Sequence, residues 1–529
     1  MATVTEHEPV LLAGSWQPGN STSTFQAYNP AACEVIADAF PVSSWHDCEI
    51  ALDAAVSAAE ELRRLPAERI AEFLEAYADL IDSNIDELAS IANLETGLPV
   101  EPRLAKVEGP RTSGQLRQAA AAARDGTWAQ ATIDTATDIR SVMEAIGPVC
   151  VFGPNNFPFA FGSVSGGDFA AAIAAGNPVI GKANTSHPGT TKKLAELAAI
   201  AIEKTGLPAA TVQLIYRVSH EDGAKLVSDP RCAAVGYTGS RGAGLKLKAA
   251  ADATGTPIYL ELSSVNPVVM LPGAFAQRGG EIVDEFVTSV LMGTGQFCTN
   301  PGLVLALAGN ETESFISSVK ERFEAAAPGT LLSQSVQSSL TSALATLTGA
   351  GAELLCGGEV VENTCSVQNT LLRVDGKKFV EAPEVFQTEA FGNASLVVVA
   401  ESIDEMAAVL KSLEGNLTGC VYSAADGRDD EAYDQLAPIL ASKVGRVLND
   451  KMPTGVAVSP AMNHGGPFPA TGHPGFTAVG IPASIPRFAK LTCYDGIRPA
   501  RLPAILQNKN PTGAYRFVDK KWTTDDIDS

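Results

Sequence analysis

The residue with the clearest chemical potential in this sequence is Cys298, within MGTGQFCTNPG at residues 292–302. Two glycines precede it and an Asn-Pro-Gly turn follows it at residues 300–302, so a helix cannot continue through this stretch. The thiol is therefore expected on a loop that faces a cleft, where it could act as a nucleophile. The alternative is a buried cysteine that packs as a small hydrophobic residue, as most free cysteines do.

A carboxylate, Glu261, lies upstream in the run PIYLEL at residues 257–262, at an expected strand end. Burying a carboxylate costs free energy unless it serves a purpose, although an edge charge that reaches water is the simpler alternative. A nucleophilic thiol and a distant carboxylate, with no suitable histidine motif nearby, favour thioester chemistry in which Glu261 activates water.

Composition limits the classes of protein and partner. With 529 residues the chain exceeds what one hydrophobic core supports, so two or three domains are expected. The net charge of −22 argues against nucleic acid or an anionic membrane as a partner. No apolar run approaches the ~20 residues of a membrane span, and MATVTEHEP at the start lacks the features of a signal peptide.

Cysteine and histidine spacing gives no sign of a disulfide framework or a metal site. The 9 cysteines occur singly, without a CxxC pair, and the 6 histidines show no HExxH spacing. We therefore expect no metal and a reducing cytoplasmic location.

Strand and helix patterns alternate regularly between residues 147 and 262. Strands are expected at residues 149–152, 179–180, 212–215, 233–237 and 258–260, and helices at 166–175, 189–205, 222–228 and 242–253. This alternation predicts a parallel sheet covered on both faces. The GxGxxG fingerprint is absent after the first strand, where residues 153–158 read GPNNFP, so an ordinary Rossmann cofactor pose is not supported.

Two other features of this half could hold a nucleotide. YTGS at residues 237–240 ends a strand and opens a helix, whose free N–H groups would attract a pyrophosphate, although serine also caps helices without any ligand. Lys182 ends another strand and could reach ribose hydroxyls, although a lone lysine there is more often solvated.

The remaining segments suggest helices, a ribbon and a second α/β domain. Residues 1–47 look poor in strands, two long helices split by Pro66 are expected over 48–94, and residues 133–142 look like an exposed ribbon. Further helices are expected at residues 104–124, 281–292, 313–327, 336–347 and 429–440, and strands near 265–270, 303–308, 395–399 and 419–422. Beyond Val447 the Pro- and Gly-rich sequence predicts a long ordered loop that lines a site or a subunit contact.

Over nearly its full length the chain resembles the aldehyde dehydrogenase superfamily. The motifs that carry the resemblance are PNNFP (154–158), Lys182, YTGS (237–240), LELS (260–263), GQFC (295–298) and EAFG (389–392). Within the superfamily, residues 295–302 and 452–471 are similar to a branch that contains NADP-dependent α-ketoglutarate semialdehyde dehydrogenases and a bacterial fatty aldehyde dehydrogenase. Departures from the usual motifs are Asn155, Ser263, Ser264 and Asn393.

The resemblance implies an α/β fold with two Rossmann-like parallel domains and a small oligomerisation β-ribbon. Residues 1–127 and 148–262 would form the cofactor-binding domain, 263–470 the catalytic domain, and 128–147 with 485–505 the ribbon. A homodimer or homotetramer is expected.

The resemblance also implies a catalytic mechanism. Cys298 would attack the aldehyde, and the oxyanion would be held by the Asn156 amide and the Cys298 backbone N–H. Glu261 would deprotonate the water that hydrolyses the thioester.

Cofactor contacts follow from the same motifs. Lys182 and Glu389 would hold the riboses, Ser240 the pyrophosphate, and Phe391 would pack near the nicotinamide. NADP is expected to be preferred, with NAD as the alternative, because members that favour NAD carry a glutamate where this chain has the neutral Thr185. Arg217 is a candidate partner for the 2′-phosphate.

The expected substrate is a small aldehyde that carries a carboxylate, with α-ketoglutarate semialdehyde favoured and Arg111 binding the carboxylate. Phe297, Phe468 and Phe476 would line the same tunnel, and they suit a fatty or aromatic aldehyde equally well. His464, in NHGG, is placed among the substrate-binding residues. It is also the candidate partner of Cys298 in an alternative of another class, a cysteine-dependent acyl hydrolase or transferase.

Overall fold

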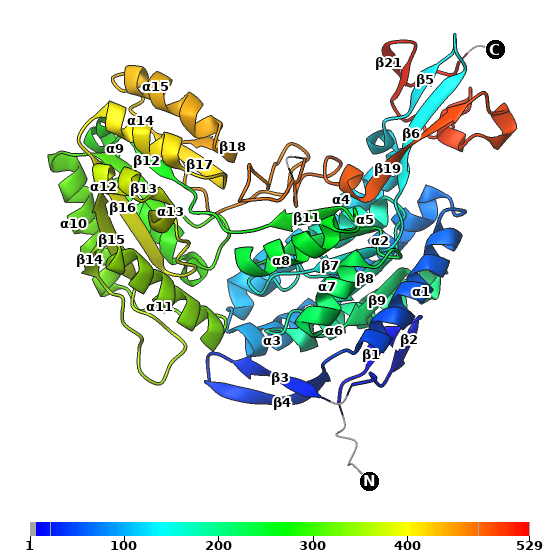
Figure 1. Ribbon diagram of the computed structural model, residues 1–529, viewed down its shortest axis with the longest axis horizontal. Helices are drawn as coiled ribbons and strands as arrows, with labels where there is room; N and C mark the ends of the chain where they lie inside the picture. The colour runs from blue at the N-terminus through cyan, green and yellow to red at the C-terminus, as the bar shows by residue number, and fades with distance from the viewer. Residues whose placement is uncertain (1–6, 22, 474, 528–529) are drawn as a thin grey trace.

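The computed structural model describes residues 7–21, 23–473 and 475–527. Two seven-stranded sheets, each packed between helices, form two lobes, and a five-stranded sheet projects from one of them (Figure 1). The predicted α/β fold with two parallel sheets is confirmed. The expectation about a signal peptide falls mostly on residues 1–6, which lie outside the described residues. None of the described helices has the length and apolarity needed to cross a membrane.

The first sheet contains the strands that were predicted between residues 147 and 262. Its strands in spatial order are β11 (Ile258–Glu261), β10 (Ala234–Thr238), β7 (Val149–Phe152), β8 (Val179–Lys182), β9 (Val212–Ile215), β1 (Val10–Leu12) and β2 (Ser15–Gln17). The strands from β7 to β11 pair in parallel, and the side chains of β7 are all buried, as the continuous apolar run VCVF requires.

The order in which the chain forms the strands of this sheet indicates where the sheet would bind a ligand. From β7 the chain moves outward to β8 and β9, then returns to the other side of β7 to form β10 and β11. The loops after β7 and β10 therefore flank a topological switch point, where α/β sheets bind their ligands. Residues 153–158 and 239–240 form these two loops.

Helices cover both faces of this sheet. They are α1 (Trp45–Leu62), α2 (Ala67–Ser83), α3 (Ile85–Thr96), α4 (Gly109–Asp125), α5 (Gly167–Ala174), α6 (Pro188–Thr205), α7 (His220–Ser228) and α8 (Arg241–Asp252). The break at Pro66 is where it was predicted, but the second expected helix is divided again at Asn84, which separates α2 from α3. Residues 100–108 form a π-helical turn before α4.

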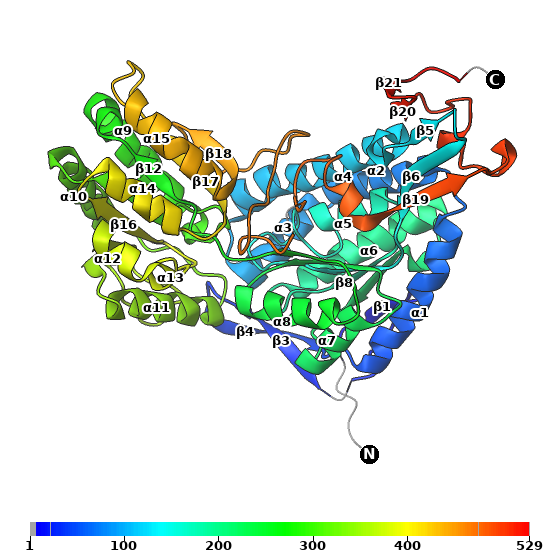
Figure 2. The ribbon, with the colours of Figure 1, turned by 45° about the horizontal axis from the view of Figure 1, so that its top comes forward.

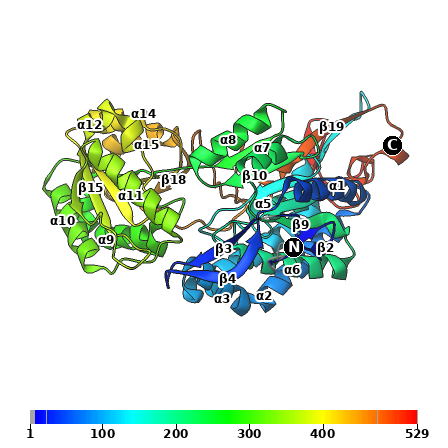
Figure 3. The ribbon, with the colours of Figure 1, turned by 60° about the horizontal axis from the view of Figure 1, so that its bottom comes forward.

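The expectation that residues 1–47 are poor in strands is wrong. β1 and β2 form an antiparallel hairpin that extends the first sheet, and β3 (Thr24–Asn29) pairs with β4 (Glu34–Pro41). Figure 3 shows this second hairpin reaching along α3 beneath the lobe. β1 and β2 are only three residues long, and a run of three residues is too short to show an alternating pattern.

The second sheet resembles the first in order and direction. Its strands are β14 (Glu353–Cys356), β15 (Thr370–Asp375), β16 (Ala394–Ala400), β13 (Leu303–Leu307), β12 (Val268–Met270), β17 (Asn416–Tyr422) and β18 (Val444–Asn449). All pairs are parallel except that of β14 with β15. Its helices are α9 (Pro272–Leu291), α10 (Asn310–Ala325), α11 (Gln334–Gly349), α12 (Gly376–Glu381), α13 (Pro383–Phe386), α14 (Ile403–Ser412) and α15 (Asp430–Ala441).

The projecting sheet joins the predicted ribbon to the C-terminal region. Its order is β19 (Ala489–Asp495), β6 (Ile139–Ala145), β5 (Thr132–Asp134), β20 (Arg516–Val518) and β21 (Lys521–Thr523). β5 and β6 form the hairpin expected at residues 133–142, and β6 pairs with β19 along its whole length. The sheet extends past residue 505, because β20 and β21 belong to it.

The Pro- and Gly-rich segment at residues 450–484 runs between the two lobes, in orange in Figures 1 and 2. Leu262 N donates to Ala470 O at 2.8 Å and Gly472 N donates to Leu260 O at 3.0 Å, which attaches the segment to the end of β11. Gly415 N donates to Phe468 O at 3.1 Å, which attaches it to the second lobe in front of β17. We call residues 463–472 the bridging strap.

Candidate active site

Cys298 lies on a loop at the amino edge of the second sheet, between α9 and β13. Gly293 and Gly295 have φ values of 56° and 68°, and a Cβ on Gly295 would lie 2.0 Å from Gly392 O. This position therefore requires glycine. Asn266 Nδ2 donates to the carbonyl oxygens of Cys298 and Asn300 at 2.9 and 2.8 Å, which holds the loop from the crossover between β11 and β12.

The two sheets bring Glu261 and Cys298 together, and the bridging strap adds His464. Glu261 is the last residue of β11, at the carboxyl edge of the first sheet. His464 Nε2 lies 3.3 Å from Cys298 Sγ and 3.0 Å from Glu261 Oε1, and the His464 and Glu261 side chains are each 1% exposed. His464 Nε2, which carries at most one proton, therefore lies within hydrogen-bonding distance of both groups.

The electrostatic environment keeps the resting thiol protonated. Burial and the negative charge of Glu261 raise the pKa of Cys298 well above its usual value, and Arg111 lowers it only in part. Cys298 therefore needs a base before it can attack, and His464 Nε2 is within reach of its sulfur.

The position of His464 depends on close backbone packing in the strap. A Cβ on Gly465 would lie 2.1 Å from Phe476 O, so only glycine fits at the position after His464. The His464 backbone N–H donates to Thr477 Oγ1 at 3.0 Å. A bridge between Thr471 and Glu261 aligns the strap with β11.

The Asn156 side-chain amide contacts the loop that carries Cys298. It lies in the loop after β7, at the switch point of the first sheet, and Nδ2 donates to Gln296 O at 2.9 Å. An amide NH₂ group has two donors, so one N–H remains for a substrate oxygen. Within the described chain, the Cys298 N–H has no backbone acceptor, which leaves a second donor.

Two cavities meet at Cys298, which is the single described residue that lines both. One is a cleft of about 490 Å³ between the lobes, whose lining includes Asn156, Ser240, Glu261, Glu389 and Phe391. The other, of about 450 Å³, is lined largely by apolar residues together with Arg103, Arg111 and His464. Glu261 faces the first cavity and His464 the second.

The first cleft fits a dinucleotide. Ser240 is the N-cap of α8 but makes no side-chain capping bond, and a Cβ on Gly242 would meet no atom within 4 Å. The first turn of α8 is therefore open, and its N–H groups and dipole favour a phosphate.

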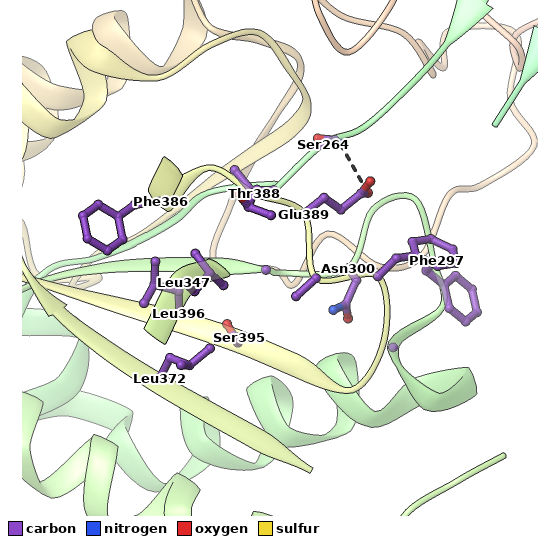
Figure 4. A pocket seen from close by; sticks show the side chains of 15 residues that line it. Ser264, Phe297, Asn300, Leu347, Leu372, Phe386, Thr388, Glu389, Ser395 and Leu396 are labelled. Atoms are coloured by element: carbon purple, nitrogen blue, oxygen red, sulfur yellow. Dashed lines mark hydrogen bonds between the residues drawn. The ribbon is translucent and has the colours of Figure 1, made fainter. Parts of the chain in front are cut away.

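Glu389 and Phe391 enter the same cleft from the loop before β16. Glu389 Oε1 accepts a hydrogen bond from Ser264 N at 3.3 Å, which Figure 4 shows beside a small cavity behind the cleft. Burial and the charge of Glu261 raise the pKa of Glu389 to about 7, against the opposing effect of hydrogen bonds from Ser264 and Ser263.

Lys182, Thr185 and Arg217 gather at the carboxyl ends of β8 and β9, next to the cleft but outside its lining. Burial and the nearby charge of Arg217 lower the pKa of Lys182 to about 8. Thr185 and Arg217 are exposed. Two neighbouring cations suit a phosphate group.

Arg111 lines the second cavity, and its guanidinium is only partly satisfied. Nη1 donates to Val456 O at 2.5 Å, and the group lies 5.4 Å from the centre of the Phe161 ring. Nε and Nη2 are buried and have no hydrogen-bond partner in the described chain. Burial lowers the pKa of Arg111, and an anion in the cavity would reverse this effect.

Phe297 lines this cavity, whereas Phe468 and Phe476 lie elsewhere. Phe468 is 58% exposed and its ring faces Arg241, with 6.0 Å between guanidinium carbon and ring centre. Phe476 is buried against Arg487. The expectation for these two residues is corrected, because the bridging strap turns Phe468 outward and the loop after it packs Phe476 into the interior.

Sequence reasoning missed two residues that shape the site. Arg103 donates to Glu108 Oε2 at 2.5 Å and to Asn156 O at 2.9 Å, so it fixes the backbone that carries the oxyanion amide. Asn266 holds the Cys298 loop and has a φ of 48°, a conformation that asparagine tolerates. In the sequence, the position before Pro267 was the only feature that could have pointed to Asn266. No periodic pattern pointed to Arg103.

Two of the departures noted in the sequence have structural roles. Ser264 Oγ donates to Asn266 Oδ1 at 2.8 Å, so the serine orients the side chain that holds the Cys298 loop. Asn393 Nδ2 donates to Val367 O at 2.9 Å and to Asn369 Oδ1 at 2.7 Å.

A cysteine and a histidine 3.3 Å apart also meet the geometry of an acyl hydrolase, so the comparison with known proteins decides between the two classes. The aldehyde dehydrogenase family model matches residues 16–466. α-Ketoglutaric semialdehyde dehydrogenase 2 of Azospirillum brasilense is 40% identical over 526 residues, 97% of this chain and 98% of the relative. The α-ketoglutaric semialdehyde dehydrogenase of Acinetobacter baylyi is 34% identical, over 94% of this chain and 95% of the relative.

The same family accounts for the fold. Aldehyde dehydrogenase C of Pseudomonas syringae, solved as a mutant with NAD+ and octanal, superposes with a TM-score of 0.78 at 20% identity, covering 94% of this chain and 98% of that one. The thiol, carboxylate and dinucleotide-sized cleft are the parts that such an enzyme needs. The chain belongs to the aldehyde dehydrogenase family and is an oxidoreductase that acts on aldehydes with NAD or NADP.

Proposed function

We propose that this enzyme oxidises α-ketoglutarate semialdehyde to α-ketoglutarate and that Arg111 binds the substrate carboxylate. The observation that carries the proposal is the buried Arg111 guanidinium, with two unused donor nitrogens in the same cavity as Cys298. A buried cation with unsatisfied donors costs free energy, so this cavity favours an anionic ligand. The names of the relatives at 40% and 34% identity support the same substrate.

The proposed acylation begins at Cys298. Its proton moves from Sγ to His464 Nε2, and the resulting N–H faces both the thiolate and Glu261 Oε1. The thiolate attacks the aldehyde carbon, and the oxyanion is held by the free N–H of Asn156 and by the Cys298 backbone N–H. When bound in the cleft, a nicotinamide would supply the hydride acceptor needed to oxidise the thiohemiacetal to a thioester.

Hydrolysis falls to Glu261 in this proposal. Its Oε2 is buried and has no partner in the described chain, while Oε1 contacts His464. Glu261 therefore keeps one oxygen available to take a proton from water, and the hydroxide attacks the thioester to release the carboxylate product.

NADP is proposed as the preferred cofactor. Lys182 and Arg217 place two positive charges close together at the edge of the cleft, and Thr185 adds a neutral hydroxyl. A 2′-phosphate there would offset the repulsion between the cations, whereas the hydroxyl of NAD would not. Within the cleft, Ser240 would contact the pyrophosphate, Glu389 a ribose, and Phe391 the nicotinamide. Lys182 would reach the other ribose from the edge of the cleft.

A fatty or aromatic aldehyde is the second candidate substrate. The observation in its favour is the apolar lining of the second cavity, which includes Phe157, Phe161, Phe297 and Met292. Such an aldehyde would leave the free donors of Arg111 unpaired, so we place it behind the anionic substrate.

The test is Arg111→Met, assayed with α-ketoglutarate semialdehyde and with a neutral aldehyde of similar length. Loss of a charge-assisted contact is expected to lower kcat/KM for the anionic substrate by about 1.5–3 kcal/mol, and to affect the neutral one little. Arg117→Met is the matched control, because Arg117 lies on the same helix but pairs outside with Asp79 and Asp82. An equal loss with both substrates would favour the fatty or aromatic aldehyde.

The assembly and location are also proposals. We propose a division into a cofactor-binding domain (1–127 and 148–262), a catalytic domain (263–470) and a ribbon (128–147 and 485–505), in which β20 and β21 extend the ribbon past residue 505. We propose a homodimer or homotetramer formed through the ribbon, whose β19 exposes Leu491. The nine free cysteines fit a reducing cytoplasm.

A further inference from the structure

We propose that Cys298, His464 and Glu261 also form a reversible inhibitory site for Zn²⁺. A thiolate sulfur, an imidazole nitrogen and a carboxylate oxygen are the three ligand types that zinc prefers. One ligand atom from each residue lies within 4.8 Å of the other two. These residues are far apart in the sequence, so no local ligand motif revealed the group.

The distances are close to those of a tetrahedral zinc site. Ideal zinc bond lengths place S and N about 3.6 Å apart and N and O about 3.4 Å apart. The corresponding distances here are 3.3 Å from Cys298 Sγ to His464 Nε2 and 3.0 Å from His464 Nε2 to Glu261 Oε1. A shift of a few tenths of an ångström would open the group around an ion.

Two independent features point toward a cation. Glu261 Oε2 has no hydrogen-bond partner in the described chain, and it is buried, since the whole side chain is only 1% exposed. His464 Nε2 contacts both the Cys298 thiol and the Glu261 carboxylate but has only one lone pair or one proton to share between them, whereas an ion among the three groups would contact Sγ, Nε2 and a carboxylate oxygen together. Binding would release the thiol proton to solvent and leave a thiolate, a carboxylate and a neutral imidazole around the metal.

The site is accessible and would keep one coordination position open. Cys298 lines both cavities, so an ion could arrive from either side and retain a water as its fourth ligand. The coordinated sulfur could not attack an aldehyde. Metal binding follows from the geometry alone, while inhibition rests on the proposed role of Cys298.

The test uses Co²⁺ as a spectroscopic probe, without substrate or cofactor. In a Cys493→Ser background, which removes the exposed thiol of β19, one Co²⁺ per chain is expected to give a thiolate charge-transfer band that Zn²⁺ displaces. Cys298→Ala should abolish the band, and His464→Gln and Glu261→Gln should each raise the Kd at least tenfold. Circular dichroism checks that each variant is folded.

A second measurement follows the sulfur directly. Zn²⁺ should slow iodoacetamide alkylation of Cys298 at least tenfold in the Cys493→Ser protein, and EDTA should restore both labelling and activity. The proposal is overturned if Cys298→Ala keeps the band, or if folded His464→Gln and Glu261→Gln bind as tightly as their parent. An active dehydrogenase that binds no metal would refute this inference alone, whereas a metal-binding protein without dehydrogenase activity would refute the proposed reaction.

Discussion

Three side chains from distant parts of the chain form the reacting centre, and single atoms within it have separable roles. Cys298 Sγ is the proposed nucleophile, while Glu261 Oε2 is the oxygen left free to act on water. His464 Nε2 contacts both residues, so a change at either one alters the hydrogen bonding of the other.

The first prediction separates acylation from hydrolysis. Cys298→Ala should abolish aldehyde oxidation, because the nucleophile is lost. Glu261→Gln should still release up to one equivalent of reduced cofactor per subunit in a rapid burst, and its steady-state kcat should fall by about 10²–10⁴ because the general base is missing. Stopped-flow absorbance of the reduced cofactor measures both phases. Steady-state turnover at the wild-type rate in either variant would contradict these roles.

The second prediction concerns cofactor choice. Arg217→Ser should lower kcat/KM for NADP by about 1.5–3 kcal/mol and change that for NAD little, and Thr185→Glu should also act against NADP through like charges. Arg231→Ser is the control, because Arg231 pairs with Asp53 and Asp229 away from the cleft. A wild-type kcat/KM that is higher with NAD than with NADP would refute the preference.

At the level of elements, the site is assembled where the carboxyl edge of one sheet faces the amino edge of the other. The crossover from β11 to β12 passes between them and carries Glu261, Ser264 and Asn266 in six residues. Through Ser264 this crossover also orients Glu389, from the loop before β16. One short connection therefore aligns the base, the nucleophile loop and a cofactor contact.

The third prediction is a pH dependence of cofactor binding that originates in Glu389. Its pKa of about 7 means that the carboxylate is mostly ionised at about pH 8 and mostly protonated at about pH 6. The ionised form is the stronger acceptor and carries no competing O–H, so the Kd for NADP should rise about tenfold as the pH falls from about 8 to about 6. Isothermal titration calorimetry measures the effect. Glu389→Gln should bind less tightly at about pH 8 and show a flatter profile, and an unchanged slope would assign the titration to another group.

How well these elements could be predicted from the sequence depended on their burial and their length. β7 and β9 were predicted at their observed bounds because buried parallel strands are rich in apolar residues: β7 reads VCVF, and in β9 only Gln213 interrupts the apolar run. β1 and β2 were missed because strands of three residues carry no period. The pairing of His464 with Glu261 and Cys298 could not be read from spacing, since tertiary contacts of the bridging strap create it, and the same contacts displaced Phe468 and Phe476 from their expected places.

For the whole molecule, the projecting five-stranded sheet is the surface best suited to self-association. It has β19 as an edge strand, and Leu491 on that strand is 66% exposed. An exposed apolar edge strand is a ready template for pairing with a second chain.

The fourth prediction tests this surface. Leu491→Lys should shift the oligomer toward smaller species, as measured by size-exclusion chromatography with light scattering, because it places a charge in the proposed contact. Ile200→Lys is the matched control, since Ile200 is 49% exposed on α6, outside the ribbon. A monomeric wild type, or the same mass for both variants, would remove the ribbon from the assembly.

The meeting of two separate cavities at Cys298 has a consequence for the kinetic order of the reaction. With the dinucleotide in the first cavity and the aldehyde in the second, as proposed, the two would reach the sulfur by different routes, because no other described residue lines both cavities. The carboxylate can therefore depart while the dinucleotide is still in place, and either reactant can arrive first. Such an enzyme would bind its two substrates in random rather than compulsory order. Its carboxylate product would be a competitive inhibitor with respect to the aldehyde and not with respect to the dinucleotide.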